Sequence, residues 1–477
     1  MMNRSDTPPG HAAPRRRTGL AAAALALVSA LALALAGCQR AGADAAAPGA
    51  ASTAAASGPV EITLMRFFGS CDARYGTSTD ATKAVGECGI LTSLVNRFNA
   101  EHQGRIVVKT QTAEWGPYYD QLTARLVAQD VPAISVMHES LIGDYVRRKL
   151  IEPLDDGFRE VGIDVDDFTD HARRGVTYDG RTWAMPFDTW SWLWHFNMGL
   201  MKKAGLVQAD GSPVLPRSPA ELLAQARQFK AATGKPYFTW AAANEQSANT
   251  RTLLTLVFQQ GGRIFSDDGR HLDLHTPEVK RALDLMKQLY DEGHIKPGTD
   301  YPGANQAFLN GDAGVLIVGT WTIDQYMKEA RSGDSALRAG YHVTPFPQLF
   351  EKPAAFADGH AWVLMKGGTP DPRSRRAALE VLKFFYDHDL DWARTGHLPT
   401  RRSIAESAEF RALPYRAGLA TITRDGVSVP SVVPTQRAVE ALIGEDVSNL
   451  LVNDKPREQV LSTIEKRVNA ALRRAHR

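Results

Sequence analysis

Strand and helix patterns alternate regularly over residues 60–146, and few fold classes accommodate that order. The stretch opens with Val60–Leu64, where apolar and polar side chains alternate with the two-residue period of a strand. Helical patterns, with apolar residues every three or four positions, separate this strand from two more. The order predicts a parallel sheet with helices on both faces, and therefore an α/β fold. The later strands are expected at 106–108 and 133–137, and the helices around 91–98, 118–126 and 141–146.

Two later helices carry clear start signals. Ser218, Pro219 and Glu221 form a capping box with proline in the first turn, and Thr276 with Pro277 gives a similar start. A length of 477 residues allows two to three folding units. A buried strand and a last helix are expected at 315–318 and 460–472.

The N-terminus has the composition of an export signal. Arg15–Arg17 precede the apolar run Leu20–Ala36, which ends in Leu-Ala-Gly before Cys38. A basic region, a short apolar region and small residues at the end predict a signal peptide over residues 1–37. The Leu-Ala-Gly-Cys sequence resembles the lipobox of bacterial lipoproteins, which implies that Cys38 carries lipid and anchors the chain to a membrane. The alternative is a plain transmembrane anchor, with Cys38 there by chance.

Residues 38–58 are rich in Ala, Gly, Ser and Thr and predict a flexible tether between the lipid and the folded part. Export would place that part in the cell envelope or periplasm. The chain has 3 cysteines, so Cys71 and Cys88 remain if Cys38 carries lipid. An oxidising compartment favours a disulfide between them, and two free thiols are the alternative.

The composition excludes some classes of function. A formal net charge of +2 gives no strong field for nucleic acid, and no nucleic-acid partner is expected. The sequence has no Gly-x-Ser-x-Gly elbow, Walker loop or His-Glu-x-x-His helix, so we expect neither an enzyme nor a cofactor. His271 and His275 lie in an alternating stretch and are interpreted as surface residues, so no metal site is predicted. A glycosidase with Glu139 and Asp188 as its carboxylate pair and a structural envelope protein are the alternatives.

Short segments along almost the whole exported part carry a family resemblance. They are Asn96–His102, Tyr119–Leu122, Tyr178–Pro186, Phe196–Asn197, Lys203–Leu206, Phe308–Ala313, Gly319–Trp321, Asp358–Trp362 and Thr395–Arg401. In joint order and spacing they resemble the extracellular solute-binding proteins of sugar-type ABC transporters, a group that includes maltose- and trehalose-binding proteins. The resemblance implies a type II periplasmic binding protein fold, with two α/β lobes, a multi-strand hinge and a ligand cleft. It also implies a monomer that delivers a di- or oligosaccharide to permease subunits.

In such proteins the chain crosses between the lobes more than once. We expect crossings near Asp188, Val318 and Asp387. Lobe 1 would then hold residues 59–188 and 319–387, and lobe 2 would hold residues 189–318 and 388–477.

One departure from the family bears on the ligand. Pro132-Ala133 stands where the family often has Pro-Asp before the third strand. Relatives that bind glycerol-3-phosphate show a similar Pro-Ala. Glycerol-3-phosphate or a glycerophosphodiester is therefore the alternative to a sugar.

A sugar site needs flat aromatic side chains for C–H faces and polar groups for hydroxyls. Tryptophans at 190, 192 and 194 would share one face of a strand. Trp190 is the candidate to stack on the ligand, and Asp188 is the candidate to bind a hydroxyl. Trp192 and Trp194 are expected in the core. The alternative is that all three tryptophans lie in the core. Trp321, in a Gly-Thr-Trp turn, lines the cleft by resemblance.

Further candidate ligand-binding residues lie near strand ends or in segments that line the cleft in relatives, and Trp240 and Asn244 lie in a loop that could close from the second lobe. For Glu139 and Arg401 a surface position is the alternative. The candidates are Trp115, Glu139, Gly359, His360, Arg401, Phe68, Asp72, Trp240 and Asn244.

Overall fold

The structure is a computed structural model that describes residues 58–243, 246–332 and 334–476. The predicted signal peptide, Cys38, the predicted tether up to residue 57 and Asn244 lie outside these ranges. Within the described part of the chain, none of the helices combines the length and apolar character that a membrane span requires.

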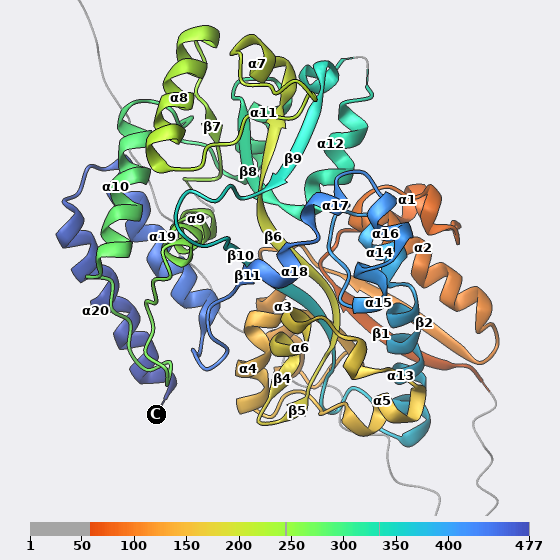
Figure 1. The fold of residues 1–477 in the computed structure, drawn as a ribbon. Helices are drawn as coiled ribbons and strands as arrows, with labels where there is room; N and C mark the ends of the chain where they lie inside the picture. The colour runs from red at the N-terminus through yellow and green to blue at the C-terminus, as the bar shows by residue number, and fades with distance from the viewer. Residues whose placement is uncertain (1–57, 244–245, 333, 477) are drawn as a thin grey trace, which may run out of the picture. The chain divides into compact units, whose positions relative to one another are not determined.

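The strands form one nine-stranded sheet, in the order β2-β1-β3-β10-β6-β8-β7, with β9 on β6 and β11 on β10 (Figure 1). β1 is parallel to β2 and β3, as the alternating pattern predicts, whereas β10 runs antiparallel to β3 and β6. A separate hairpin pairs β4 with β5. The strands are β1 (Val60–Arg66), β2 (Ile106–Thr112), β3 (Ile134–His138), β4 (Thr177–Tyr178), β5 (Arg181–Thr182), β6 (Met185–Asn197), β7 (Phe238–Thr239), β8 (Val315–Gly319), β9 (Tyr341–Pro345), β10 (Ala355–Leu364) and β11 (Gly426–Val427).

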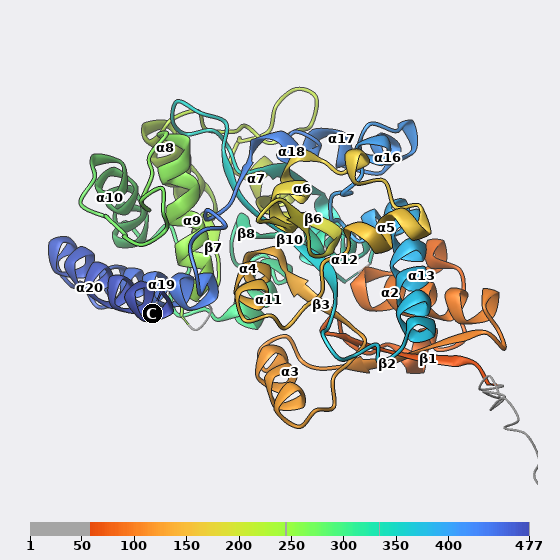
Figure 2. The same cartoon turned by 90° about the horizontal axis from the view of Figure 1, so that it is seen from below.

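Helices cover both faces of β1 and β2. Figure 2 shows α2 and α13 on one face and α3 on the other. The helices are α1 (Asp72–Tyr75), α2 (Gly86–Glu101), α3 (Tyr118–Val127), α4 (Glu139–Arg147), α5 (Asp155–Val161), α6 (Asp170–Val176), α7 (Met198–Lys203), α8 (Pro219–Thr233), α9 (Gln246–Gln259), α10 (Pro277–Asp291), α11 (Tyr301–Leu309), α12 (Ile323–Glu329), α13 (Pro372–Asp387), α14 (Asp389–Ala393), α15 (Arg402–Ala405), α16 (Ala408–Ala412), α17 (Arg416–Leu419), α18 (Ile422–Asp425), α19 (Gln436–Val452) and α20 (Arg457–Ala475).

The helix start signals act where the sequence places them. Ser218 accepts a hydrogen bond from the backbone N–H of Glu221 at the start of α8. Thr276 does the same for Val279 at the start of α10. The Glu221 carboxylate accepts from the N–H of Arg217, one residue earlier than a capping box requires.

Three buried apolar clusters divide the part of the chain that the structure describes. The first core is drawn from residues 62–187 and 361–392. The second core uses residues 190–317, 346–356 and 429–472. A smaller third core combines Leu193 with residues 304–343, 357 and 393–422. All residues of β6 are buried, and along β6 the packing changes from the first core at Phe187 to the second at Trp190.

The cores divide the chain differently from the expected lobe boundaries after Val318. Residues 323–357 pack in the second and third cores, and the first core resumes only at Ala361 in β10. The chain turns back after β8, because Tyr326 and Tyr341 pack on the ring of His195 in β6. The last change, between Trp392 and Ala393, also follows Asp387 by a few residues.

Candidate ligand-binding site

A cavity of about 300 Å³ lies where β6 and β10 pass between the first and second cores. Its volume is at the lower end of the range of roughly 300–1,000 Å³ that is typical of small-molecule sites. Aromatic side chains dominate the wall, and a few polar groups interrupt them. The lining residues are Phe67, Glu87, Trp115, His138, Trp190, Trp192, Arg251, Tyr301, Trp321 and His360.

The tryptophans pack against one another, Trp190 and Trp321 edge to face and Trp192 and Trp321 at a tilt. The ring centroids of Trp190 and Trp321 are 5.6 Å apart with an interplanar angle of 79°, and those of Trp192 and Trp321 are 6.3 Å apart. The Trp321 indole N–H donates to the hydroxyl of Tyr301 over 2.7 Å. This bond holds the Trp321 ring in place and leaves its faces for packing or for ligand.

Arg251 of α9 is the cation of this wall. Its guanidinium carbon lies 4.7 Å from the ring centroid of Trp190 and 5.6 Å from that of Trp192, within cation–π range. It also forms an ion pair with Glu440 of α19 at 3.2 Å. The Arg251 charge is therefore partly compensated before any ligand binds.

Asp188, a predicted hydroxyl binder, lies behind the cavity wall and does not line the cavity. Its carboxylate accepts from the ring of His360 at 3.0 Å and from the indole N–H of Trp392 at 2.8 Å. Burial would raise the pKa of Asp188, but the imidazoles of His360 and His397 outweigh it and lower that pKa. Burial would likewise lower the pKa of His360, and Asp188 raises it overall. Asp188 thus holds the His360 ring, which does line the cavity.

Glu139, another candidate, is enclosed between two glycines. A Cβ on Gly359 would lie 2.5 Å from the Glu139 carboxyl carbon, and one on Gly175 would lie 2.0 Å from a carboxyl oxygen. Gly359 therefore makes room for this carboxyl group, rather than for the ligand that the sequence suggested. Burial, reinforced by Asp358, raises the pKa of Glu139 well above its usual value. Glu139 lines a second cavity of about 600 Å³ that also contacts Asp358 and His171.

The other candidates lie apart from the first cavity. Arg401 pairs with Asp167 at 2.8 Å and covers the ring of Tyr386 at 4.2 Å. Phe68 is buried in the first core, whereas the exposed Asp72 accepts from the Ser70 hydroxyl. The second core contains Trp194 and Trp240, and the indole of Trp240 donates to Asn249.

The structure brings together four of the predicted residues, Trp115, Trp190, Trp321 and His360. Trp192, expected in the core, is buried and also lines the cavity. Residues that the sequence did not single out are Phe67, Glu87, Arg251 and Tyr301.

A structural reason for the position of Glu87 is a disulfide between Cys71 and Cys88, with Cα atoms 5.7 Å apart. This cross-link pins the start of α2 beside the end of β1. The cysteine spacing was a signal that this loop is held in place, but it gave no hint that Glu87 would face a cavity.

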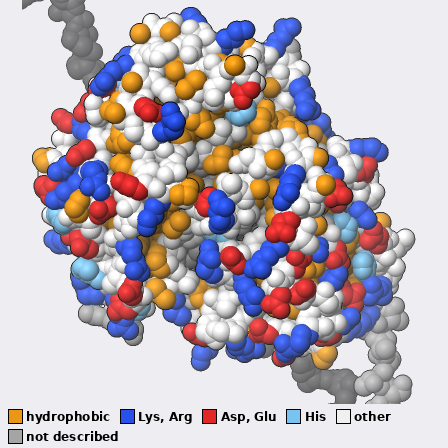
Figure 3. Space-filling model, in the orientation of Figure 1, with side chains coloured by type: hydrophobic (Ala, Val, Ile, Leu, Met, Phe, Trp, Pro, Cys, Tyr) orange, Lys and Arg blue, Asp and Glu red, His pale blue; other side chains and the backbone are white. Residues whose placement is uncertain are grey.

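The surface carries both signs of charge. Figure 3 shows Lys and Arg interspersed with Asp and Glu over one face, with hydrophobic side chains gathered in its recesses. This mixture agrees with the formal net charge of +2.

Comparisons with known proteins agree on one family. Residues 93–417 match the family described as bacterial extracellular solute-binding protein. The chain is 23% identical over 435 residues to the sn-glycerol-3-phosphate-binding periplasmic protein UgpB of Shigella dysenteriae, covering 87% of this chain and 93% of that protein. The structure resembles the GacH receptor of Streptomyces glaucescens, solved unliganded and with acarbose (TM-score 0.71, 17% identity, 87% and 99% covered). It also resembles UgpB from Mycobacterium tuberculosis in complex with glycerophosphocholine (TM-score 0.68, 17% identity, 88% and 100% covered). These likenesses confirm the expected periplasmic binding protein fold.

Proposed function

The chain belongs to the bacterial extracellular solute-binding proteins, and we propose that it captures a carbohydrate in the aromatic cavity and delivers it to the permease of an ABC importer. The observation that carries the proposal is the wall of four tryptophans, Trp115, Trp190, Trp192 and Trp321. Sugar rings present apolar C–H faces that pack on indoles, and their hydroxyls need polar partners. His138, His360, Arg251 and Glu87 would supply those partners.

A glycerol phosphate ester is the second candidate. One relative is an sn-glycerol-3-phosphate-binding protein, and another was solved in complex with glycerophosphocholine. Arg251 would be the cation that binds phosphate. Two observations favour a neutral sugar instead. Arg251 already pairs with Glu440, and the carboxylate of Glu87 faces the same cavity.

We further propose that β6 and β10 are the hinge between two lobes. The first core would form lobe 1, and the second and third cores would form lobe 2. Contacts from lobe 1 to lobe 2 fit a closed form. The backbone N–H of Gly86 donates to Asp324 at 2.7 Å, and that of Thr435 donates to Asp144 at 3.0 Å.

Arg437 of lobe 2 adds a third contact across the cleft. Its guanidinium carbon lies 5.4 Å from the ring centroid of Trp115 and 5.1 Å from that of Tyr119. A solute that touches both lobes would add to these three contacts and shift the hinge equilibrium toward the closed form.

The location proposed for the chain rests on its N-terminus. Residues 1–37 would direct export, Cys38 would carry the lipid, and the following tether would hold the monomeric binding protein at the membrane of the cell envelope. In this role the chain binds and releases its solute without chemical change, and the importer's nucleotide-binding subunits are other chains.

A thermal-shift screen tests the proposal on the part from Gly58 onward, whose described residues form a compact unit. Mono-, di- and oligosaccharides are compared with glycerol-3-phosphate and glycerophosphodiesters. A ligand at a hundred times its Kd stabilises the native state by about 2.7 kcal/mol. A shift with one sugar class supports the proposal. A shift only with phosphate esters transfers the assignment to the second candidate, and no shift with any compound contradicts solute binding in this cavity.

A further inference from the structure

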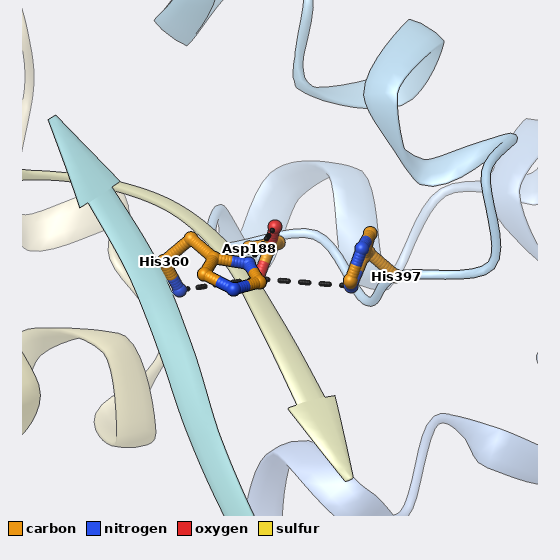
Figure 4. A group of neighbouring side chains, drawn as sticks. All are labelled: Asp188, His360 and His397. Carbon is orange, nitrogen blue, oxygen red and sulfur yellow. Dashed lines mark hydrogen bonds and ion pairs between the residues drawn. The ribbon is translucent and has the colours of Figure 1, made fainter. Parts of the chain in front are cut away.

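Behind the cavity wall, three potential metal ligands converge, Asp188, His360 and His397 (Figure 4). The backbone itself brings them together. His360 of β10 is the register partner of Asp188 of β6. The neighbouring residue Thr189 exchanges two backbone hydrogen bonds of 2.9 Å with Leu398, which places His397 beside the same strand. All three side chains are at least nine-tenths buried.

The distances between the ligand atoms suit a small cation. The Nδ1 of His360 is 3.0 Å from both carboxylate oxygens of Asp188, and the Nδ1 of His397 is 3.7 Å from one of them. A bound ion would take the place of the hydrogen that the Nδ1 of His360 donates to Asp188. The candidate ligand atoms of the three residues all lie within 4.8 Å of one another. Ligands bound at about 2.0–2.2 Å in a tetrahedral zinc site lie roughly 3.3 Å apart, so the distances from Asp188 to the two histidines differ from this value by a few tenths of an ångström.

Hydrogen bonds from outside orient two of the ligands. The Nε2 of His397 is 2.8 Å from the Glu87 carboxylate, which can only accept, so Nε2 carries the hydrogen of the neutral ring. The lone pair of Nδ1 then faces Asp188 and the hydroxyl of Thr320. The second oxygen of Asp188 accepts from Trp392. A carboxylate behind a histidine is the arrangement that fixes the tautomer of metal-bound histidines.

Charge balance supplies an independent argument. Asp188 and Glu87 are two carboxylates, and their ion pairs are with histidines rather than with lysine or arginine. A buried carboxylate needs a compensating cation, which is here either protons on the two imidazoles or a metal ion. From the ligand set, its spacing and its outer hydrogen bonds, we propose that Asp188, His360 and His397 bind one divalent transition-metal ion of the zinc class.

Such an ion would have a structural role. It would tie β6, β10 and the loop after α14 together at the hinge, and it would fix the ring of His360 in the cavity wall. The sequence predicted no metal site, because the three ligands come from distant segments without a recognisable spacing.

The test uses the purified full chain in mild detergent, stripped with a chelator and titrated with Zn²⁺ by calorimetry and with Co²⁺ by absorption spectroscopy. We expect one Zn²⁺ per chain, a higher melting temperature, and an intense tetrahedral Co²⁺ spectrum. His397→Gln should weaken Zn²⁺ binding at least 100-fold, and Glu87→Gln about 10-fold. The control His275→Gln, at an exposed histidine between Glu458 and Glu465, should leave binding unchanged.

The wild-type titration decides the question even if His397→Gln fails to fold. Absence of saturable binding would overturn the proposal and leave protonated histidines as the compensating charge. Binding that is lost in His275→Gln but kept in Glu87→Gln would show an adventitious surface site and would overturn it as well. Solute binding is measured separately on stripped protein, so failure of the metal site leaves the proposed transport function untouched.

Discussion

The two walls of the cavity are built differently. Trp190, Trp192 and His360 form a strand wall, because they stand on the central strands β6 and β10 and are almost fully buried. Trp115 and Trp321 form a rim: Trp115 is 40% exposed and Trp321 is partly buried. The strand wall therefore serves both the core and the ligand, whereas the rim serves mainly the ligand. The difference separates the residues whose loss should unfold the chain from those whose loss should only weaken binding.

The largest effect is expected on the strand wall. Trp190→Ala should lower the free energy of unfolding by about 3–5 kcal/mol, because it removes a fully buried indole beside Arg251 and Trp321. Chemical denaturation measures this. A loss below about 1 kcal/mol would erase the distinction between the two walls.

Asp389 lines neither wall, so its effect on the pH dependence of stability should be independent of solute binding. Burial raises the pKa of Asp389 to about 7, from an ordinary 3.8. The folded chain holds this proton more tightly than the unfolded chain, so the free energy of unfolding should fall as pH rises from about 4 to about 7. This pH-dependent decrease in the free energy of unfolding should be on the order of a few kcal/mol, and Asp389→Asn should remove it. Denaturation at pH 5 and pH 8 would show a smaller pH dependence for the variant, with solute affinity unchanged; an identical pH dependence would contradict the assignment.

Closure of the rim should be sensitive to Arg437, with the smallest effect. Arg437→Ala removes a cation that covers Trp115 and Tyr119, a contribution of roughly 0.5–1 kcal/mol at an exposed site. Solute affinity should fall about two- to fivefold, because the closed form loses one contact. Arg411→Ala, at another exposed arginine, is the control. Equal affinities for the two variants would exclude Arg437 from closure.

The sequence predicted local structure well, because its signals are local. The predicted order of strands and helices is found in β1, α2, β2, α3, β3 and α4. Ser218 and Thr276 cap the helices whose starts they predict. The site depended on pairings that no local pattern contains. Asp188 meets His360 across 172 positions. In the sequence nothing distinguishes Arg251 from other polar residues of a helix, because its partner Glu440 lies far away along the chain.

The points at which the chain passes from one core to another were hard to predict for a similar reason. Val318 is the last residue but one of β8, in which every residue is buried, and nothing nearby in the sequence shows whether the chain then crosses or turns back. The chain turns back, and Tyr341 holds it there through a hydrogen bond of 2.8 Å between its hydroxyl and the ring of His195. Gly359 was predicted to let the backbone approach the ligand closely, and in the structure the group beside it is the carboxyl group of Glu139.

The most direct test of the central claim, that the aromatic cavity binds the solute, compares two partly buried tryptophans. Trp321 lies on the rim, whereas Trp183 donates to the carbonyl of Tyr178 and does not line the cavity. Each is changed to Ala and titrated by calorimetry with the compound that gives the largest thermal shift. The account predicts that Trp321→Ala weakens binding about 10- to 100-fold, or roughly 1.4–2.8 kcal/mol, while Trp183→Ala binds as the wild type does. Equal affinities for both variants, with both folded, would contradict it.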